Sequence, residues 1–235
     1  MWEDTTVPNP AWERPIYEEF FRTVRTLNAS LDADQRVRVL LGDAPIDWAT
    51  VKTRDDLRRW GLQKDQYSAT VIKREVLAKK RKVLVIYGDG HLQGRGFPGE
   101  SLTVLLERPP YRTQVFAISS SRTDLSRFQP DSASWPVPSI AKVRGTVIGR
   151  RPYASFYPIP PAPGWDQVRM EDQFDAVLYL GPSPRTITSY GFPPALCSDT
   201  EYMTMRLARM AINNQSGGRN AGIEELKAFC SAQRK

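Results

Sequence analysis

The sequence predicts an α/β protein with a mostly parallel sheet and helices on both of its faces. Short β-branched and aliphatic runs alternate with amphipathic segments across residues 10–119, and this alternation is typical of parallel sheets that helices cover. A length of 235 residues suits one sizeable hydrophobic core. We therefore expect a single domain over 1–235, with an alternating core at 10–119, a loop-rich, proline-rich insertion at 120–171, and a final strand followed by helices at 172–235.

The predicted core elements come from the first half of the chain. Apolar residues at spacings of three and four predict its helices, and short aliphatic runs that end at turn residues predict its strands. In chain order we expect a helix at 10–31, a strand at 37–43, one or two short helices at 45–61, a helix at 64–80, a strand at 82–88, a helix between Pro98 and Pro109, and a strand at 113–119.

The second half has fewer predicted elements. The run QFDAVLYLG at 173–181 predicts a strand, and 221–233 predicts a short helix. The segment 198–214 predicts a helix in which Ser198 is the N-cap and Glu201 completes a capping box. Residues 140–149 suit either a helical turn or a strand. The proline-rich and serine-rich remainder of the insertion predicts irregular structure.

The net charge and hydropathy of the chain limit the classes of partner that we expect. The net charge of +7 permits an anionic partner, but each basic helix also carries acidic residues, and no nucleic-acid-binding signature is present. We expect a small-molecule substrate or ligand and no nucleic acid. No run approaches the roughly 18 apolar residues of a membrane span, and the acidic start MWEDTTVPNPAW is unlike a signal peptide. We expect no membrane span and a soluble protein, cytoplasmic as given and exported if a leader was removed.

The two cysteines, Cys197 and Cys230, lie 33 positions apart without a CxxC motif or a neighbouring histidine. This spacing argues against a structural zinc site. The alternatives are one disulfide, in an exported protein, or two buried thiols, and we favour the thiols.

The only histidine, His91, follows the predicted strand 82–88. The helix 64–80 would rise about 24 Å and the strand would span about 23 Å, so the strand returns to the level at which the helix began. Asp65 shares a helix face with the core positions Ala69 and Ile72. We therefore expect Asp65 to lie near His91.

Other carboxylates are expected at the same edge of the sheet. Asp43 would follow a strand parallel to 82–88, Asp47 lies one turn further, and Asp89 precedes His91 by two residues. We expect Asp43, Asp65, Asp89 and His91 to form one cluster, where open α/β sheets bind ligands. A histidine flanked by carboxylates can be a general base, the partner of a nucleophile or a metal ligand.

We expect His91, Asp43 and Asp65 to be catalytic, and Asp47, Lys64, Tyr87 and Asp89 to contact the substrate. The glycines at 88 and 90 would let the backbone turn sharply or approach a ligand closely. The alternative interpretation is structural. Gly-Asp-Gly after a strand is ordinary turn chemistry, a loop histidine is often only hydrogen-bonded, and Lys64 is also typical of a solvated helix face.

The ordered motifs resemble the superfamily of the erythromycin esterases, the ChaN-type haem-binding lipoproteins and the TraB/Tiki proteins. In that family an Arg-Asp pair opens a helix, with an alanine four or five residues later, and leads to a strand ending in Gly-x-x-His. Lys64-Asp65 with Ala69, and Gly88 with His91, match this order. The resemblance covers about 36–119 and 172–181, where SLTVLLERPPY, TQVFAI, VRVLLGD with its Asp43, and QFDAVLYLG are similar to further family elements.

The sequence departs from the family at two points. It has no Gly-Glu-x-His motif, because it has no second histidine, and Lys64 stands where the family has Arg. Either the strand with that motif is missing from this chain or the site works differently. The resemblance implies a hydrolase-like enzyme that acts on an ester or similarly activated bond, with His91 as base, or alternatively a catalytically silent module that binds a small ligand or haem. We expect no cofactor, with haem or a divalent cation as the alternative, and His91, Tyr87 or a methionine as candidate haem ligands.

Overall fold

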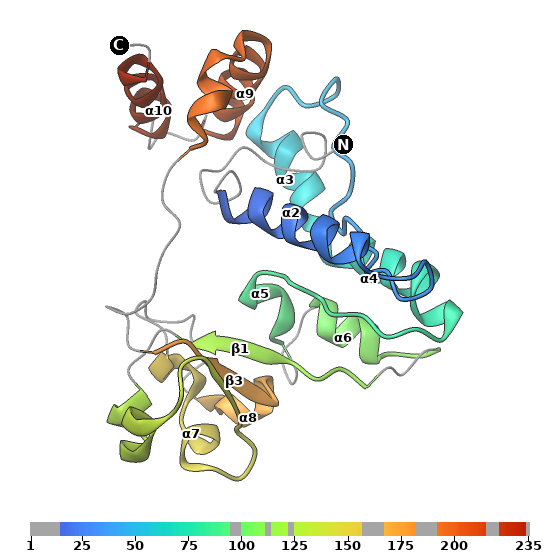
Figure 1. Ribbon diagram of the computed structural model, residues 1–235, viewed down its shortest axis with the longest axis vertical. Helices are drawn as coiled ribbons and strands as arrows, with labels where there is room; N and C mark the ends of the chain where they lie inside the picture. The colour runs from blue at the N-terminus through green and yellow to red at the C-terminus, as the bar shows by residue number, and fades with distance from the viewer. Residues whose placement is uncertain are drawn as a thin grey trace. The chain divides into compact units, whose positions relative to one another are not determined.

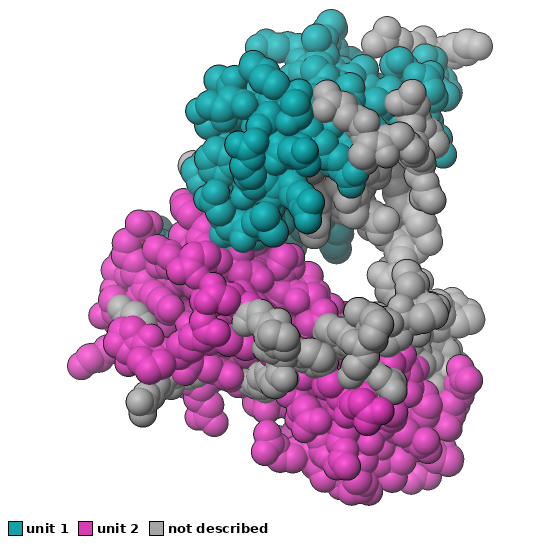
Figure 2. Space-filling view, turned by 180° about the vertical axis from the view of Figure 1, so that it is seen from behind, with its two compact units in different colours: residues 1–64, 188–235 teal, residues 65–187 magenta. Residues whose placement is uncertain are grey.

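The computed structural model describes residues 15–94, 100–110, 114–121, 125–156, 167–181, 192–214 and 221–233. The chain forms two compact units, which Figure 2 colours separately. Unit 1 combines residues 1–64 with 188–235, and unit 2 is the continuous segment 65–187. Unit 1 therefore draws on both arms of the sequence. The expected single domain stays a prediction.

Unit 1 is helical in its described part (Figure 1). Its elements are α2 (Pro15–Ala29), α3 (Arg54–Leu62), η7 (Pro194–Ser198), α9 (Thr200–Asn213) and α10 (Ala221–Ala232). One apolar cluster contains Ile46, Val51 and Leu57 and includes Ile212 from α9 at its edge. The guanidinium of Arg209, also on α9, lies 4.2 Å from the centre of the Trp48 ring. Helix α9 thus packs against the part of unit 1 that comes from the first arm.

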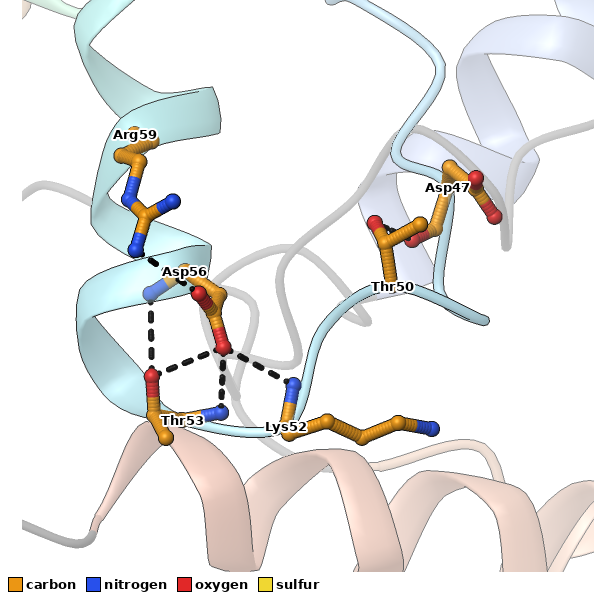
Figure 3. Close-up of polar contacts among 6 residues, drawn as sticks. All are labelled: Asp47, Thr50, Lys52, Thr53, Asp56 and Arg59. Carbon is orange, nitrogen blue, oxygen red and sulfur yellow. Dashed lines mark hydrogen bonds and ion pairs between the residues drawn. The ribbon is translucent and has the colours of Figure 1, made fainter.

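Helix α3 begins with a complete capping box (Figure 3). The hydroxyl of Thr53 accepts a hydrogen bond from the backbone N–H of Asp56 at 3.2 Å, and the Asp56 carboxylate accepts one from the backbone N–H of Thr53 at 2.9 Å. The hydrogen bonds from the Thr53 side chain and from the backbone N–H groups of Lys52 and Thr53 lower the pKa of Asp56. The box satisfies the backbone N–H groups of Thr53 and Asp56 at the start of the helix.

Two predictions in the second arm need correction. The N-cap of α9 is Asp199, whose carboxylate accepts a hydrogen bond from the backbone N–H of Tyr202, and not Ser198. The prediction of two buried thiols is wrong, because Cys197 and Cys230 form a disulfide that joins η7 to α10. Both cysteines are buried with Met203, Met210 and Leu226. The burial was expected correctly, but a spacing in sequence does not reveal whether two sulfur atoms meet.

Unit 2 contains a three-stranded sheet in the order β1-β3-β2. The strands are β1 (Ile118–Ser121), β2 (Ser139–Lys142) and β3 (Ala176–Tyr179), and β3 pairs parallel with β1 and antiparallel with β2. The helical elements are α4 (Lys64–Glu75), η1 (Leu77–Lys79), α5 (Asp89–Leu92), α6 (Leu102–Glu107), η2 (Leu125–Arg127), η3 (Pro130–Ser134), α7 (Val147–Arg150), η4 (Tyr153–Phe156) and α8 (Met170–Gln173).

The core of unit 2 has two parts. One surrounds the sheet and contains Phe174, Met170 and Tyr153. The other joins α4 to α6 through Ala69, Ile72, Leu102, Leu105 and Leu106. Val115, which precedes β1, packs against both parts. The segment that leads into β1 therefore links the sheet to the helical half of the unit.

The predicted fold class is wrong: the described chain is mainly helical, and its one sheet is small and mixed. The runs 37–43 and 82–88 have no described strand pairing. In the second run Val85 packs against the α4–α6 core, whereas Leu84 and Ile86 are 81% and 71% exposed. A continuous apolar run predicts a strand covered on both faces, but here one face alone is covered by described residues.

The elements predicted after residue 112 agree in part with the structure. The predicted strand 173–181 contains β3, and the strand predicted at 113–119 overlaps β1 at its C-terminal end. Residues 140–149 contain both alternatives, since β2 ends at Lys142 and α7 begins at Val147. The insertion is not wholly irregular, because it contains β2 and several short helices. Leu125, Ile148 and Tyr153 from these helices pack in the core around the sheet. Pro98 and the N-terminal residues 1–14 lie outside the described residues.

Candidate functional site

Helix α4 and the segment that follows it bring Asp65 and His91 together. Asp65 lies in the first turn of α4, and Ala69 and Ile72 on the same helix are buried. The chain reverses at Lys80, whose φ of 55° is left-handed. Residues 82–88 then return along α4, with Val85 and Tyr87 against its buried residues. The predicted return of the chain is confirmed, although no strand forms.

The Asp65–His91 pair, called the dyad below, is closely hydrogen-bonded. His91 Nδ1 lies 2.6 Å from Asp65 Oδ1. An ionised carboxylate only accepts hydrogen bonds, so Nδ1 must carry the proton and donate it. In the neutral imidazole the lone pair then resides on Nε2, and no described residue forms a hydrogen bond with that atom. The side chains of His91 and Asp65 are 35% and 22% exposed, so both are partly accessible to solvent.

Tyr87 limits the orientation of the imidazole from another side. The centres of the Tyr87 and His91 rings lie 4.6 Å apart, and their planes are inclined by 53°. The Tyr87 hydroxyl is 3.1 Å from Oγ of Ser68, a buried residue one helical turn after Asp65. Two adjacent turns of α4 thus contact the histidine, one directly and one through Tyr87.

The Asp89 carboxylate is held within unit 2. Its Oδ2 accepts hydrogen bonds from Tyr153 Oη at 3.1 Å and from Ser119 Oγ at 3.3 Å. Burial raises the pKa of Asp89, and the hydrogen bonds from Tyr153 and Ser119 oppose this shift. Burial and the neighbouring carboxylate also raise the pKa of Tyr153. Substrate binding by Asp89 stays a prediction, and its described partners are these two hydroxyls.

The remaining candidates belong to unit 1. Lys64 Nζ forms an ion pair with Asp43 Oδ2 at 3.1 Å, with both side chains about a quarter exposed. Asp47 organises its own turn. Its carboxylate accepts a hydrogen bond from the backbone N–H of Ala49. Its backbone carbonyl accepts one from the hydroxyl of Thr50 at 2.8 Å (Figure 3). Asp43 and His91 lie in different units, so the expected four-residue cluster is not described. Roles for Asp43, Asp47 and Lys64 at the dyad stay predictions.

Three residues that contact Tyr87 or Asp89 were not expected from the sequence: Ser68, Ser119 and Tyr153. A signal existed for Ser68, because a residue three positions after Asp65 lies on the same helix face. Ser119 and Tyr153 carried no signal, since they come from a strand end and from a segment expected to be irregular. Their convergence on Asp89 depends on tertiary packing alone.

Among the described residues, no group of three His, Cys, Asp or Glu side chains is placed to hold a metal ion. None of the helices in the described ranges is long and apolar enough to cross a bilayer.

Comparison of the chain with known protein families, with curated proteins and with solved structures finds no match. The resemblance to the erythromycin esterase, ChaN and TraB/Tiki superfamily therefore stays a prediction that rests on the motifs of the sequence.

Proposed function

We propose that this protein is a hydrolase-like enzyme that acts on an ester or similarly activated bond, with the dyad as its acid–base pair. The observation that carries the proposal is the 2.6 Å hydrogen bond from His91 Nδ1 to Asp65 in a partly exposed position. A carboxylate at Nδ1 orients the imidazole and stabilises its protonated form, which leaves Nε2 to accept a proton.

The proposed reaction uses water as the nucleophile. Nε2 of His91 takes a proton from water as the water oxygen bonds to the carbonyl carbon of the ester. Asp65 stabilises the imidazolium that forms, and it does not itself take the proton. His91 then returns the proton to the leaving alkoxide as the ester C–O bond breaks, which yields a carboxylic acid and an alcohol. The enzyme is unchanged at the end of the cycle.

The test is turnover of an aryl ester such as p-nitrophenyl acetate. We expect His91→Ala and Asp65→Asn each to lower kcat/KM by at least about tenfold, because general acid–base groups contribute on the order of 10²–10⁴ in rate. Asp65→Asn is the sharper variant, since it keeps the imidazole and removes the carboxylate that orients it. Glu75→Gln, on the same helix but paired with Arg74 and Lys79, is the matched control and should turn over like wild type. Equal rates in all four proteins would exclude the proposal.

The same geometry supports a second candidate, a catalytically silent module that binds haem. A histidine that ligates a metal through Nε2 usually donates its other N–H to a carboxylate or carbonyl, and His91 makes such a contact with Asp65. Titration with haem would then give a shifted Soret band that His91→Ala abolishes. This result without ester turnover would replace the hydrolase proposal.

The Cys197–Cys230 disulfide supports a location where thiols are oxidised. Disulfides are rare in the cytosol and common in exported proteins. We infer that the chain works in an oxidising compartment. Alkylation of the protein in intact cells, before any reduction, tests this: both cysteines should resist the reagent unless a reductant is added. Complete alkylation without reductant would place the working protein in a reducing compartment.

A further inference from the structure

The segment that carries His91 is fastened at three points. This segment, called the His91 loop, comprises residues 89–94 and includes α5. Asp89 accepts hydrogen bonds from Tyr153 and Ser119 at one end of the loop. In its middle, the carbonyl of Leu92 accepts a hydrogen bond from Thr103 Oγ1 at 2.8 Å. At the far end, the backbone N–H of Gly94 donates to Gln173 Oε1 at 2.6 Å.

The side chains that hold the loop are buried. Thr103 and Gln173 are 0% exposed, Tyr153 is 2% exposed and Ser119 is 4% exposed. They come from different elements of unit 2, namely α6, α8, η4 and β1. Burial of a polar side chain costs free energy unless its hydrogen bonds are made. Each of these four side chains makes such a bond to the loop, so displacement of the loop would leave buried polar groups without these partners.

The backbone at the end of the loop has one conformation that few residues adopt. Gly94 has a φ of +115°, a region that is open to glycine and strained for residues with a side chain. A Cβ atom at this position would also lie 3.1 Å from Oγ of Ser101, the N-cap of α6. Any larger residue at position 94 would therefore disturb both the loop and the start of α6.

We infer that Asp89 is a positioning residue, which through Tyr153 and Ser119 holds the His91 loop so that Nδ1 of His91 meets Asp65. An ordinary surface turn would not need buried side chains from four elements, whereas a preorganised catalytic group does. This inference rests on the proposed function of the dyad, but its test does not require turnover.

The chain offers a direct spectroscopic readout because His91 is its only histidine. With ¹⁵N-labelled imidazole, NMR therefore reports one ring, and its nitrogen shifts distinguish the Nδ1–H from the Nε2–H tautomer. We expect the wild-type protein to show a single Nδ1–H form. Asp89→Ala should give mixed tautomers or broadened signals, and Asp89→Asn should restore the wild-type pattern, because the amide oxygen still accepts from Tyr153 and Ser119.

Two further variants separate positioning from general destabilisation. Thr146→Ala removes the N-cap of α7, where the Thr146 hydroxyl accepts a hydrogen bond from the backbone N–H of Gly149. This contact lies in the same unit but does not involve the loop, so the variant should lower the melting temperature with no change at His91. Tyr153→Phe removes one of the two hydrogen bonds to Asp89 and keeps the buried ring, so it should mix the tautomers even if Asp89→Ala fails to fold. A wild-type His91 pattern in folded Asp89→Ala or in Tyr153→Phe would overturn the inference. Altered patterns together with a wild type that has no esterase activity would retain the positioning role and remove the hydrolase proposal.

Discussion

Individual side chains divide into those the sequence could place and those it could not. The contact between Asp65 and His91 was predictable, because helix spacing places the acid on the buried face of α4 and the lengths of the two segments match. Asp89 was expected among the same carboxylates, yet it faces Tyr153 and Ser119. The backbone at Gly88 has an ordinary φ of −63°, so the left-handed freedom of glycine is used at Gly94 rather than there.

The partly buried carboxylate of Asp89 predicts a pH dependence of stability. Burial raises its pKa above the ordinary value of 3.8. At pH values between 3.8 and the raised pKa of the folded state, the folded protein binds more protons at Asp89 than the unfolded chain does. The contribution of Asp89 to the free energy of unfolding therefore falls as the pH rises through that interval. The groups facing Asp89 are the hydroxyls of Tyr153 and Ser119, which stay neutral there.

The measurement is urea unfolding of the wild-type protein and of Asp89→Asn, from about pH 4 to about pH 7. Relative to this variant, which cannot ionise at position 89, the wild-type protein should become more stable as the pH falls. Parallel stability curves over the whole range would show that Asp89 is not destabilised by burial of its charge.

Single elements were predicted well where the signal is local. The helices α2, α4, α9 and α10 follow apolar spacing that a reader of the sequence can count, and their observed ends lie within the predicted ranges. Strands depend on partners that are distant in the chain. The run 82–88 has the composition of a buried strand but no described neighbour on its Leu84 side, whereas the similar run in β3 lies between two strands.

Helix α3 allows the contribution of a local capping motif to stability to be measured. Its capping box joins Thr53 to Asp56 through reciprocal hydrogen bonds. We expect Thr53→Ala to lower the free energy of unfolding by about 1 kcal/mol, because the hydroxyl that satisfies the first turn is lost. Thr53→Ser keeps the hydroxyl and is the matched control. Urea unfolding measures both, and equal midpoints for the two variants would show that the cap contributes nothing measurable.

At the level of the whole chain, the Cys197–Cys230 disulfide is a covalent crosslink that restricts the unfolded state. It connects residues separated by 33 positions within one arm of unit 1. A crosslink over a loop of this length is expected to stabilise the folded state by about 3–4 kcal/mol, mainly by restricting the unfolded chain. Reduction should therefore lower the melting temperature of unit 1.

Calorimetry of the intact protein with and without dithiothreitol measures this effect. The Cys197→Ser/Cys230→Ser double variant should melt like the reduced wild-type protein and should not respond to the reductant. An unchanged transition on verified reduction would show that packing around η7 and α10 suffices without the covalent link.

Because unit 1 is built from two segments that are distant in the sequence, the two units cannot complete folding at the same time during synthesis. Its first arm ends at residue 64, and its second arm begins at residue 188. The polypeptide emerges from the ribosome N-terminal end first, and domains generally fold as units once their residues are available. Residues 65–187 can therefore fold before Arg209 of α9, whose guanidinium contacts the Trp48 ring, has been synthesised. The first arm must remain without its partners from the second arm, Arg209 and Ile212 among them, while the more than one hundred residues of unit 2 are translated.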